Sequence, residues 1–337
     1  HSQLGSQERH VHLRIREILL YHLLHRALNN RGRIRPEVAE RIRAIADEMG
    51  YKTNQLGRAL SMSRNNIKIG VILQGAETPF MKEVLKGIQE ACAEVDNLGG
   101  TVLVHKIEHQ NAEDVIRAME KMRMEEVSGI AMVPLDEESV KREIDRFVEE
   151  LRIPVVTFTS DVEDTKRLCF VGQNGVQCGR AAAGLMGELT GGKGKVAVIS
   201  GYSTNTSLSS RVTGFREEMV RKYPGIEIIG PEYCFEENGR AREITEGIFK
   251  EVPDLDGIYL TSHGEEGVCE AIAGEGKAGQ VKMVANDFMG RNYELMREGF
   301  IHFLIGQDAR IQGYEPVMIL FRLLFNGEKP EREKIFT

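Results

Sequence analysis

Residues 67–73 read IKIGVIL, an apolar run of strand length that decides the fold. Residues 79–95 follow it with apolar side chains at helical spacing, and a second apolar run comes at 101–105, after the two glycines at 99–100. Short apolar runs that alternate with amphipathic helices are typical of a parallel, doubly wound sheet. The chain is therefore predicted to form an α/β fold from residue 67 onward.

The same alternation continues along most of the chain and restarts once. Apolar runs at 129–133 and 154–158 complete a first set, and a second set of helices and strands occupies 177–285. Two sets imply two similar lobes, and ligands of open parallel sheets bind beyond the carboxyl ends of the strands. We expect a ligand cleft between a first lobe, 67–172 with 303–328, and a second lobe, 173–302 with 329–337.

Charge is distributed unevenly between the two ends of the chain. Residues 1–66 hold 12 Lys and Arg against 6 Asp and Glu, whereas residues 67–337 hold 32 against 45. A basic head on an acidic body is typical of a protein that contacts phosphate at one end. The alternative is a chance cluster of basic residues on a solvated helix.

A helix is predicted over 35–49, and 55–61 is too short to be helical without a partner.

Three features predict a cytoplasmic protein. No run of about 18 apolar residues predicts a membrane span, and the apolar stretch at 11–25 is interrupted by Arg14, Arg16 and Glu17, unlike a secretory signal. The five cysteines are dispersed without a C-x-x-C pair, which favours reduced thiols over a disulfide framework.

A series of short motifs carries a family resemblance. The motifs are RALNNRGRI at 26–34, PEV at 36–38, EMGY at 48–51, the segment 54–60 and IGV at 69–71. In this order they closely resemble the lactose-repressor (LacI/GalR) family of transcription regulators. The second lobe resembles the ribose-binding type of bacterial sugar receptor.

That resemblance implies a fold and a function. The fold would be the periplasmic-binding-protein type I fold, with two doubly wound parallel-sheet lobes, plus a small all-α helix-turn-helix head over 1–53 and a hinge helix and linker over 54–66. The function would be that of a homodimeric repressor that binds operator DNA and a small sugar or polyol effector. The residues expected to contact DNA are Arg26, Asn29, Asn30, Leu56, Arg58 and Leu60, the last as a wedge between base pairs.

The first 25 residues depart from the family pattern. They contain no Gly at a turn and no row of Ser, Thr or Asn side chains to read base edges. This departure leaves open a second hypothesis, a cytosolic sugar-binding protein that does not bind DNA.

The resemblance also implies a sugar site at the strand ends. Sugar recognition needs planar polar side chains for adjacent hydroxyls and rings for the apolar faces. Phe80 and Phe235 would supply rings, the Arg211 guanidinium a rigid fork of donors, and Asp287 an acceptor. The full set of expected ligand contacts is Thr78, Phe80, Met81, Thr159, Asp161, Arg211, Phe235, Ser262, Asp287 and Gln307.

The third hypothesis, an enzyme, receives little support from the sequence. The glycine-rich segment 191–195 precedes a strand and has no Ser or Thr after its lysine, so it does not match a phosphate-binding loop. We therefore predict a non-enzymatic protein without cofactor or metal, whose ligand is a pentose, hexose or cyclitol.

Overall fold

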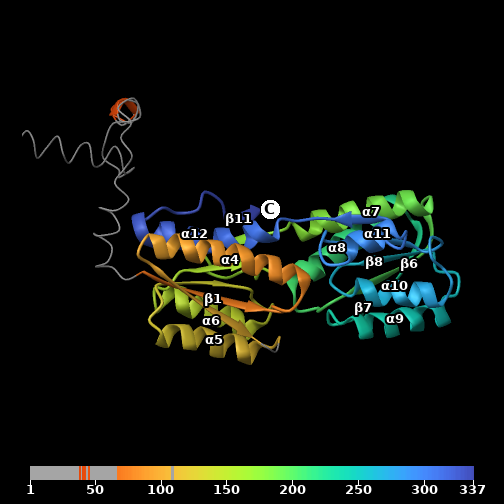
Figure 1. Cartoon of the computed structure of the whole chain (residues 1–337), viewed down its shortest axis with the longest axis horizontal. Helices are drawn as coiled ribbons and strands as arrows, with labels where there is room; N and C mark the ends of the chain where they lie inside the picture. The colour runs from red at the N-terminus through yellow and green to blue at the C-terminus, as the bar shows by residue number, and fades with distance from the viewer. Residues whose placement is uncertain (1–37, 39, 43–44, 46–66, 108–109) are drawn as a thin grey trace, which may run out of the picture. The chain divides into compact units, whose positions relative to one another are not determined.

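The computed structural model describes residues 38, 40–42, 45, 67–107 and 110–337 (Figure 1). The chain divides into a unit of residues 1–61 and a unit of residues 62–337. In the first unit, residues 38, 40–42 and 45 are helical, within the helix predicted over 35–49. The six residues expected to contact DNA and the predicted hinge helix lie outside the described residues.

The first lobe is a six-stranded, all-parallel sheet between two pairs of helices. The strand order is β11-β5-β4-β3-β1-β2. Helices α4 and α12 lie side by side on one face, and α5 and α6 cover the other (Figure 1). The strands are β1 (Lys68–Gln74), β2 (Thr101–Ile107), β3 (Gly129–Met132), β4 (Val155–Phe158), β5 (Cys169–Gly172) and β11 (Lys334–Phe336), and the helices are α4 (Pro79–Asn97), α5 (Ala112–Met124), α6 (Glu138–Glu149) and α12 (Ala309–Asn326).

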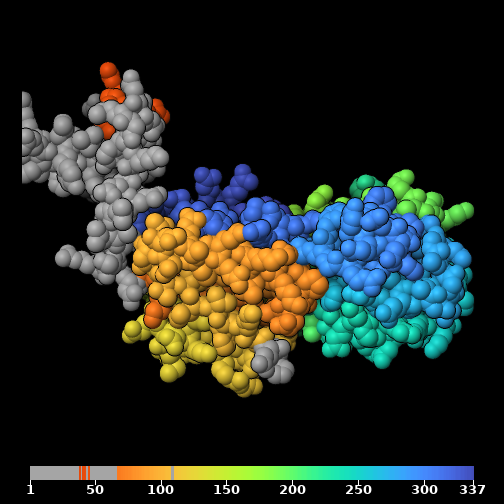
Figure 2. Space-filling model, viewed as in Figure 1, coloured from red at the N-terminus to blue at the C-terminus, as the bar shows by residue number. Residues whose placement is uncertain are grey.

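The second lobe repeats this plan with a five-stranded parallel sheet. The strand order is β10-β9-β8-β6-β7. Helices α7 and α8 pack on one face, and α9, α10 and α11 contribute apolar side chains to the other. The strands are β6 (Lys193–Ser200), β7 (Gly225–Tyr233), β8 (Gly257–Leu260), β9 (Lys282–Asn286) and β10 (Phe303–Ile305), and the helices are α7 (Gly175–Thr190), α8 (Thr206–Lys222), α9 (Asn238–Glu251), α10 (Glu265–Gly274) and α11 (Asn292–Arg297). In Figure 2 the two lobes of this unit lie next to each other, the first mostly orange to yellow and the second green to blue.

The boundaries predicted for the two lobes are wrong at the C-terminal end. Strand β10, expected in the first lobe, pairs with β9 of the second, and β11, expected in the second lobe, pairs with β5 of the first. Ion pairs hold β11 in place: Glu333 contacts Arg167 at 3.1 Å and Lys334 contacts Glu163 at 2.5 Å. Helix α12 belongs to the first lobe, as predicted.

Polar residues in the short loops after strands start several helices. Thr78 and Asn205 are the N-caps of α4 and α8, where their side-chain oxygens accept from Met81 N and Leu208 N, each at 3.3 Å. Pro79, in the first turn of α4, has no N–H to leave unsatisfied and already has a helical φ. These caps place the first turns of both helices at the carboxyl ends of the strands.

Glycines let neighbouring helices approach closely. A Cβ on Gly179 of α7 would lie 2.0 Å from the Arg211 carbonyl oxygen of α8, and one on Gly87 of α4 would lie 1.9 Å from the Arg310 carbonyl oxygen of α12. Both contacts leave no room for any larger residue. The α7–α8 contact therefore determines how deeply Arg211 lies in its lobe.

None of the helices in the described part of the chain has the length and apolar character that crossing a membrane requires.

Candidate functional site

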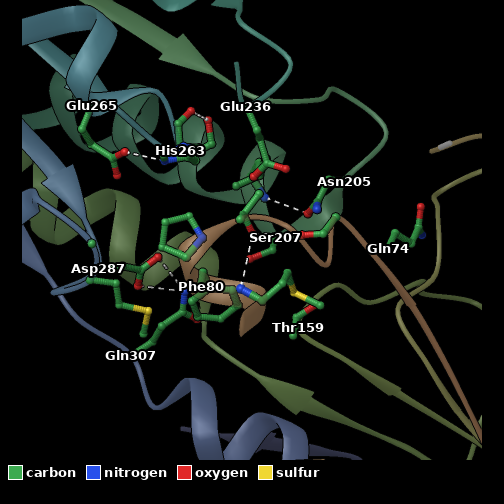
Figure 3. Close-up of a pocket in the computed structure, with 18 of the residues that line it drawn as sticks. Gln74, Phe80, Thr159, Asn205, Ser207, Glu236, His263, Glu265, Asp287 and Gln307 are labelled. Atoms are coloured by element: carbon green, nitrogen blue, oxygen red, sulfur yellow. Dashed lines mark hydrogen bonds and ion pairs between the residues drawn. The ribbon is translucent and has the colours of Figure 1, made fainter. Parts of the chain in front are cut away.

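A polar cavity lies between the two lobes, where the carboxyl ends of both sheets meet (Figure 3). Gln74 ends β1 and Thr159 follows β4 in the first lobe, whereas Asp287 follows β9 and Gln307 follows β10 in the second. This is the position that the alternation of strands and helices predicts for a ligand.

The cavity has the size of a small molecule. Its volume is about 100 Å³. Since one water molecule needs roughly 10–15 Å³ of such space, the cavity holds several water-sized groups. A monosaccharide matches that size better than an oligosaccharide does.

The structure brings together eight of the ten residues expected to bind a ligand. They come from both lobes: seven follow the ends of five different strands, and Arg211 lies in α8, so spacing along the chain alone did not place them near one another. The eight that line the cavity are Thr78, Phe80, Met81, Thr159, Arg211, Ser262, Asp287 and Gln307.

The other two expected contacts, Asp161 and Phe235, lie outside the cavity lining. The Asp161 carboxylate is paired with the guanidinium of the buried Arg167, whose Nε lies 2.5 Å from Oδ1 and whose Nη2 lies 2.7 Å from Oδ2. Phe235 is 48% exposed, and its ring centroid lies 5.4 Å from that of Tyr202. Asp161 is therefore a structural partner of Arg167, and Phe235 is a surface residue.

Asp287 and Gln307 form the polar end of the cavity (Figure 3). Gln307 Nε2 donates to Asp287 Oδ1 at 3.1 Å, and Gln307 Oε1 accepts from Gln312 Nε2 at 2.9 Å. Burial raises the pKa of Asp287 to about 6, although the charge of Arg211 and the hydrogen bond from Gln307 act in the opposite direction. A carboxylate held in this way is short of hydrogen-bond donors, which a ligand could supply.

Arg211 is anchored in the wall of the cavity. Arg211 lies in α8 and is almost fully buried, with 2% of its surface exposed. Nε donates to Gln173 Oε1 at 3.0 Å, and Nη1 donates to the Thr261 carbonyl at 2.5 Å. These bonds hold the guanidinium in one orientation beside Asp287, so it would meet a ligand as a fixed group.

Several polar lining residues were not predicted from the sequence. Gln74 is 4% exposed, and its Nε2 donates to the Val133 carbonyl at 2.8 Å, while its buried Oε1 has no hydrogen-bond partner. The signal that could have revealed it is an amide that ends an otherwise apolar strand. Others are Gln110, Asn205, Ser207, Glu236, His263, Glu265 and Asn292, which lie in the loops or first helical turns that follow strands.

His263 and Glu265 form a hydrogen-bonded pair on the same wall (Figure 3). His263 Nδ1 lies 2.8 Å from Glu265 Oε2, and this hydrogen bond raises the pKa of His263. Glu265 Oε1 also accepts from Asn292 Nδ2 at 2.8 Å. Within the described part of the chain, the His263 ring is therefore hydrogen-bonded to a carboxylate, and not to a Ser, Thr or Cys side chain that it could activate as a nucleophile.

Three residues of the cavity lining have a strained backbone. Thr159, Glu236 and Asp287 have φ values of 57°, 61° and 67°, in the left-handed region that non-glycine residues rarely adopt. For the β-branched Thr159 this conformation is especially unfavourable. Such residues cluster at binding sites, where the surrounding structure holds them in place.

Among the residues that the structure describes, no group of three or more His, Cys, Asp or Glu side chains is arranged to hold a metal ion.

Comparison with known proteins identifies the family. Residues 69–329 match the family model described as a periplasmic binding protein domain. The chain belongs to this family. The match includes both lobes and all the strands from β1 to β10, and it agrees with the type I fold expected from the sequence.

Relatives with known names fall into two groups. The D-ribose/D-allose-binding protein of Pseudomonas aeruginosa is 26% identical over 230 residues, which cover 65% of this chain and 70% of that protein. The structure of an ABC transporter solute binding protein from Agrobacterium vitis, with bound D-fucose, is 25% identical with a TM-score of 0.75 and covers 80% of this chain and 93% of that chain. DegA of Bacillus subtilis, an HTH-type transcriptional regulator, is 25% identical over 195 residues, 58% of this chain and 55% of that protein.

These comparisons overturn the identification of the chain as a lactose-repressor type regulator. No helix-turn-helix DNA-binding family matches the chain, and the similar solved structures include the solute binding protein of an ABC transporter described above. These findings leave the expectation of an operator DNA partner without support. The same holds for the helix-turn-helix head and for the homodimer that the resemblance implied. The short motifs at 26–60 resemble repressors, but they lie before the matched region. The findings favour the second hypothesis, sugar binding without DNA binding, while the cytoplasmic location stays a prediction.

Proposed function

We propose that the protein binds one small sugar or polyol in the cavity between its lobes and does not convert it chemically. The observation that carries the proposal is a pair of acceptors with few donors on opposite sides of the cavity. The buried Oε1 of Gln74 in the first lobe has no hydrogen-bond partner, and the carboxylate of Asp287 in the second lobe accepts from the Gln307 amide (Figure 3). Sugar hydroxyls are donors that would satisfy both acceptors at once.

The rest of the lining complements a polyhydroxylated molecule. Arg211, Asn205 and Gln307 supply planar donors and acceptors, which suit adjacent hydroxyls. Phe80, at the start of α4, supplies an apolar ring that could cover the face of a sugar. The named relatives that bind ribose, allose or fucose support the same class of ligand.

Contacts from both lobes would couple ligand binding to the closure of the lobes. A ligand that bridges Gln74 and Asp287 would stabilise the closed arrangement of the lobes, because it binds that arrangement more tightly than any open one. The matched family is a binding domain, which supports binding of a ligand without its chemical conversion.

A thermal-shift screen of pentoses, hexoses and cyclitols tests this proposal, because a saturating ligand raises the melting temperature by mass action. Gln307→Ala removes the amide that contacts Asp287, and we expect it to abolish the shift. Gln177→Ala, on the exposed surface of α7, serves as the matched control and should leave the shift intact. If no sugar stabilises the wild type, or if both variants respond alike, the proposal fails.

A further inference from the structure

The cavity lining carries more carboxylates than cations. Four carboxyl groups face two guanidinium groups, which leaves a formal excess of two negative charges, or of one when His263 is protonated. Such a wall disfavours anionic ligands such as sugar phosphates and sugar acids. The carboxyl groups are those of Glu236, Glu265, Glu266 and Asp287, and the guanidinium groups are those of Arg211 and Arg291.

Two of these carboxylates have partners within the protein. Glu265 accepts from His263 and Asn292, both at 2.8 Å, as well as from a backbone N–H. Glu266 Oε2 lies 3.6 Å from Arg291 Nη1. Neither of these two carboxylates needs a cation from a ligand.

The third carboxylate, Asp287, has a nearby positive charge. It accepts from Gln307 Nε2 at 3.1 Å, and the positive charge of Arg211 favours its ionised form. Arg211 itself is held in place by Gln173 and Thr261. Asp287 therefore has a positive charge and an amide donor beside it before any ligand binds, although burial still raises its pKa.

Glu236 forms no ion pair. Among the described residues, no Lys, Arg or His nitrogen lies within ion-pair distance of its carboxylate, and Gln110 supplies a neutral hydrogen bond. Its Oε2 lies 3.8 Å from the point where a Cβ on Gly75 would stand, so a second-lobe carboxylate reaches the first lobe across the cleft. Burial raises the pKa of this carboxyl group, and the charges of His263 and Arg211 and the hydrogen bond from Gln110 oppose that effect only in part.

A second, independent group in the same cavity also lacks a donor. Gln74 is 4% exposed, and its Oε1 has no hydrogen-bond partner. The cavity therefore offers acceptors in excess of donors. An ammonium group has three donors and no acceptor, so it matches this excess better than a hydroxyl group does.

We propose that the ligand is a small polyol carrying an ammonium group, such as an amino sugar, and that the Glu236 carboxylate pairs with its nitrogen. The inference rests on the proposed function and narrows it to a cationic subclass of sugars. The Glu236 carboxylate would select the ligand, because it forms no ion pair among the described residues and reaches across the cleft toward Gly75 of the first lobe.

Isothermal titration calorimetry on the full chain tests the inference. The probes are D-glucosamine and D-galactosamine, each compared with its neutral parent hexose and its N-acetyl derivative, at a pH below the pKa of the free amine. The variants are Glu236→Gln and the neighbouring Glu237→Gln, whose side chain is exposed and forms no capping hydrogen bond. Melting temperatures of both variants establish that they are folded.

We expect at least one amino sugar to bind at least tenfold more tightly than its neutral and N-acetylated counterparts. Glu236→Gln should remove that preference, and Glu237→Gln should preserve it. Neutral hexoses that bind as tightly as amino sugars would overturn this inference and leave the proposed function standing. The same conclusion would follow if Glu236→Gln reduced the affinity for amino sugars and for neutral hexoses equally. Failure of every sugar in the panel to bind would overturn both proposals.

Discussion

Replacing Asp287 by Asn should stabilise the empty protein while it weakens sugar binding. Burial raises the pKa of Asp287 to about 6 in the folded state, against an ordinary value of 3.8 for an aspartate side chain. That gap corresponds to ~3 kcal/mol for holding the carboxylate ionised in the folded protein. Because the side chain keeps partial contact with solvent, we expect a gain of about 1–2 kcal/mol in the free energy of unfolding.

The pH dependence of this gain follows from the direction of the pKa shift. An acid whose pKa is higher in the folded state binds its proton more tightly there, so its destabilising effect is absent below pH 3.8, grows between pH 3.8 and about 6, and is complete above that. The amide of Asn does not titrate and keeps an oxygen that can accept from Gln307 Nε2. The advantage of Asp287→Asn should therefore exist at about pH 7.5 and vanish near pH 4.

Thermal melting of both proteins at these two pH values measures the effect, which corresponds to an increase of roughly 2–8 °C at the higher pH. Calorimetric titration with a sugar that stabilises the wild type should show affinity reduced by at least tenfold. Asp254→Asn is a control of opposite sign, because Lys195 lowers the pKa of that surface carboxyl group. A variant Asp287→Asn that melts below the wild type near neutral pH, or whose advantage persists unchanged near pH 4, would refute the reasoning.

Three further substitutions test other parts of the structure. Arg167→Leu leaves the buried Asp161 carboxylate without its partner and should cost about 3–5 kcal/mol, measured by denaturant unfolding; an unchanged midpoint would contradict this. Gly179→Ala brings a Cβ to 2.0 Å from the Arg211 carbonyl, and we expect both a lower melting temperature and weaker sugar binding; a variant with wild-type values of both would argue against close packing of α7 and α8. Phe80→Ala should reduce sugar affinity about tenfold by removing an apolar face, as judged by calorimetry, and unaltered affinity would exclude ring stacking.

The sequence predicted the layered fold because its signals are local. Strand β1 is a continuous apolar run buried almost throughout, and α4 begins at a Thr-Pro pair and presents apolar residues at helical spacing. Strands β10 and β11 contain only three residues each, too few for a periodic pattern. Which sheet each of them joins depends on tertiary pairing, which is why the lobe boundaries were wrong there.

The cavity could be predicted from strand ends, but individual side chains could not. After β7 both Phe235 and Glu236 have positive φ values, and this turn directs Glu236 rather than its neighbour into the lining. After β4, Asp161 pairs with Arg167, six residues farther along the chain. A shift of one residue in a turn, or an ion pair formed by the following loop, leaves no recognisable trace in a pattern of apolar and polar residues.

The resemblance of the N-terminal segment to repressors added operator DNA binding to the predicted function, and the family comparison does not support that addition. Motifs at 26–60 are short and lie before the region that matches the binding-domain family. The physical evidence in the lobes, acceptors and donors gathered at the strand ends, indicated a sugar site whichever head preceded them.

The pairing of β11 with β5 affects the order in which the protein can assemble during translation. The second lobe is one uninterrupted insertion between β5 and α12, so the ribosome releases all of it before the last helix and strand of the first lobe. Contacts between segments this far apart form slowly, because a long loop must close first. A nascent first lobe therefore exposes the edge of β5 and the apolar face that α12 later covers. A chaperone that binds exposed apolar surface would act mainly in that interval.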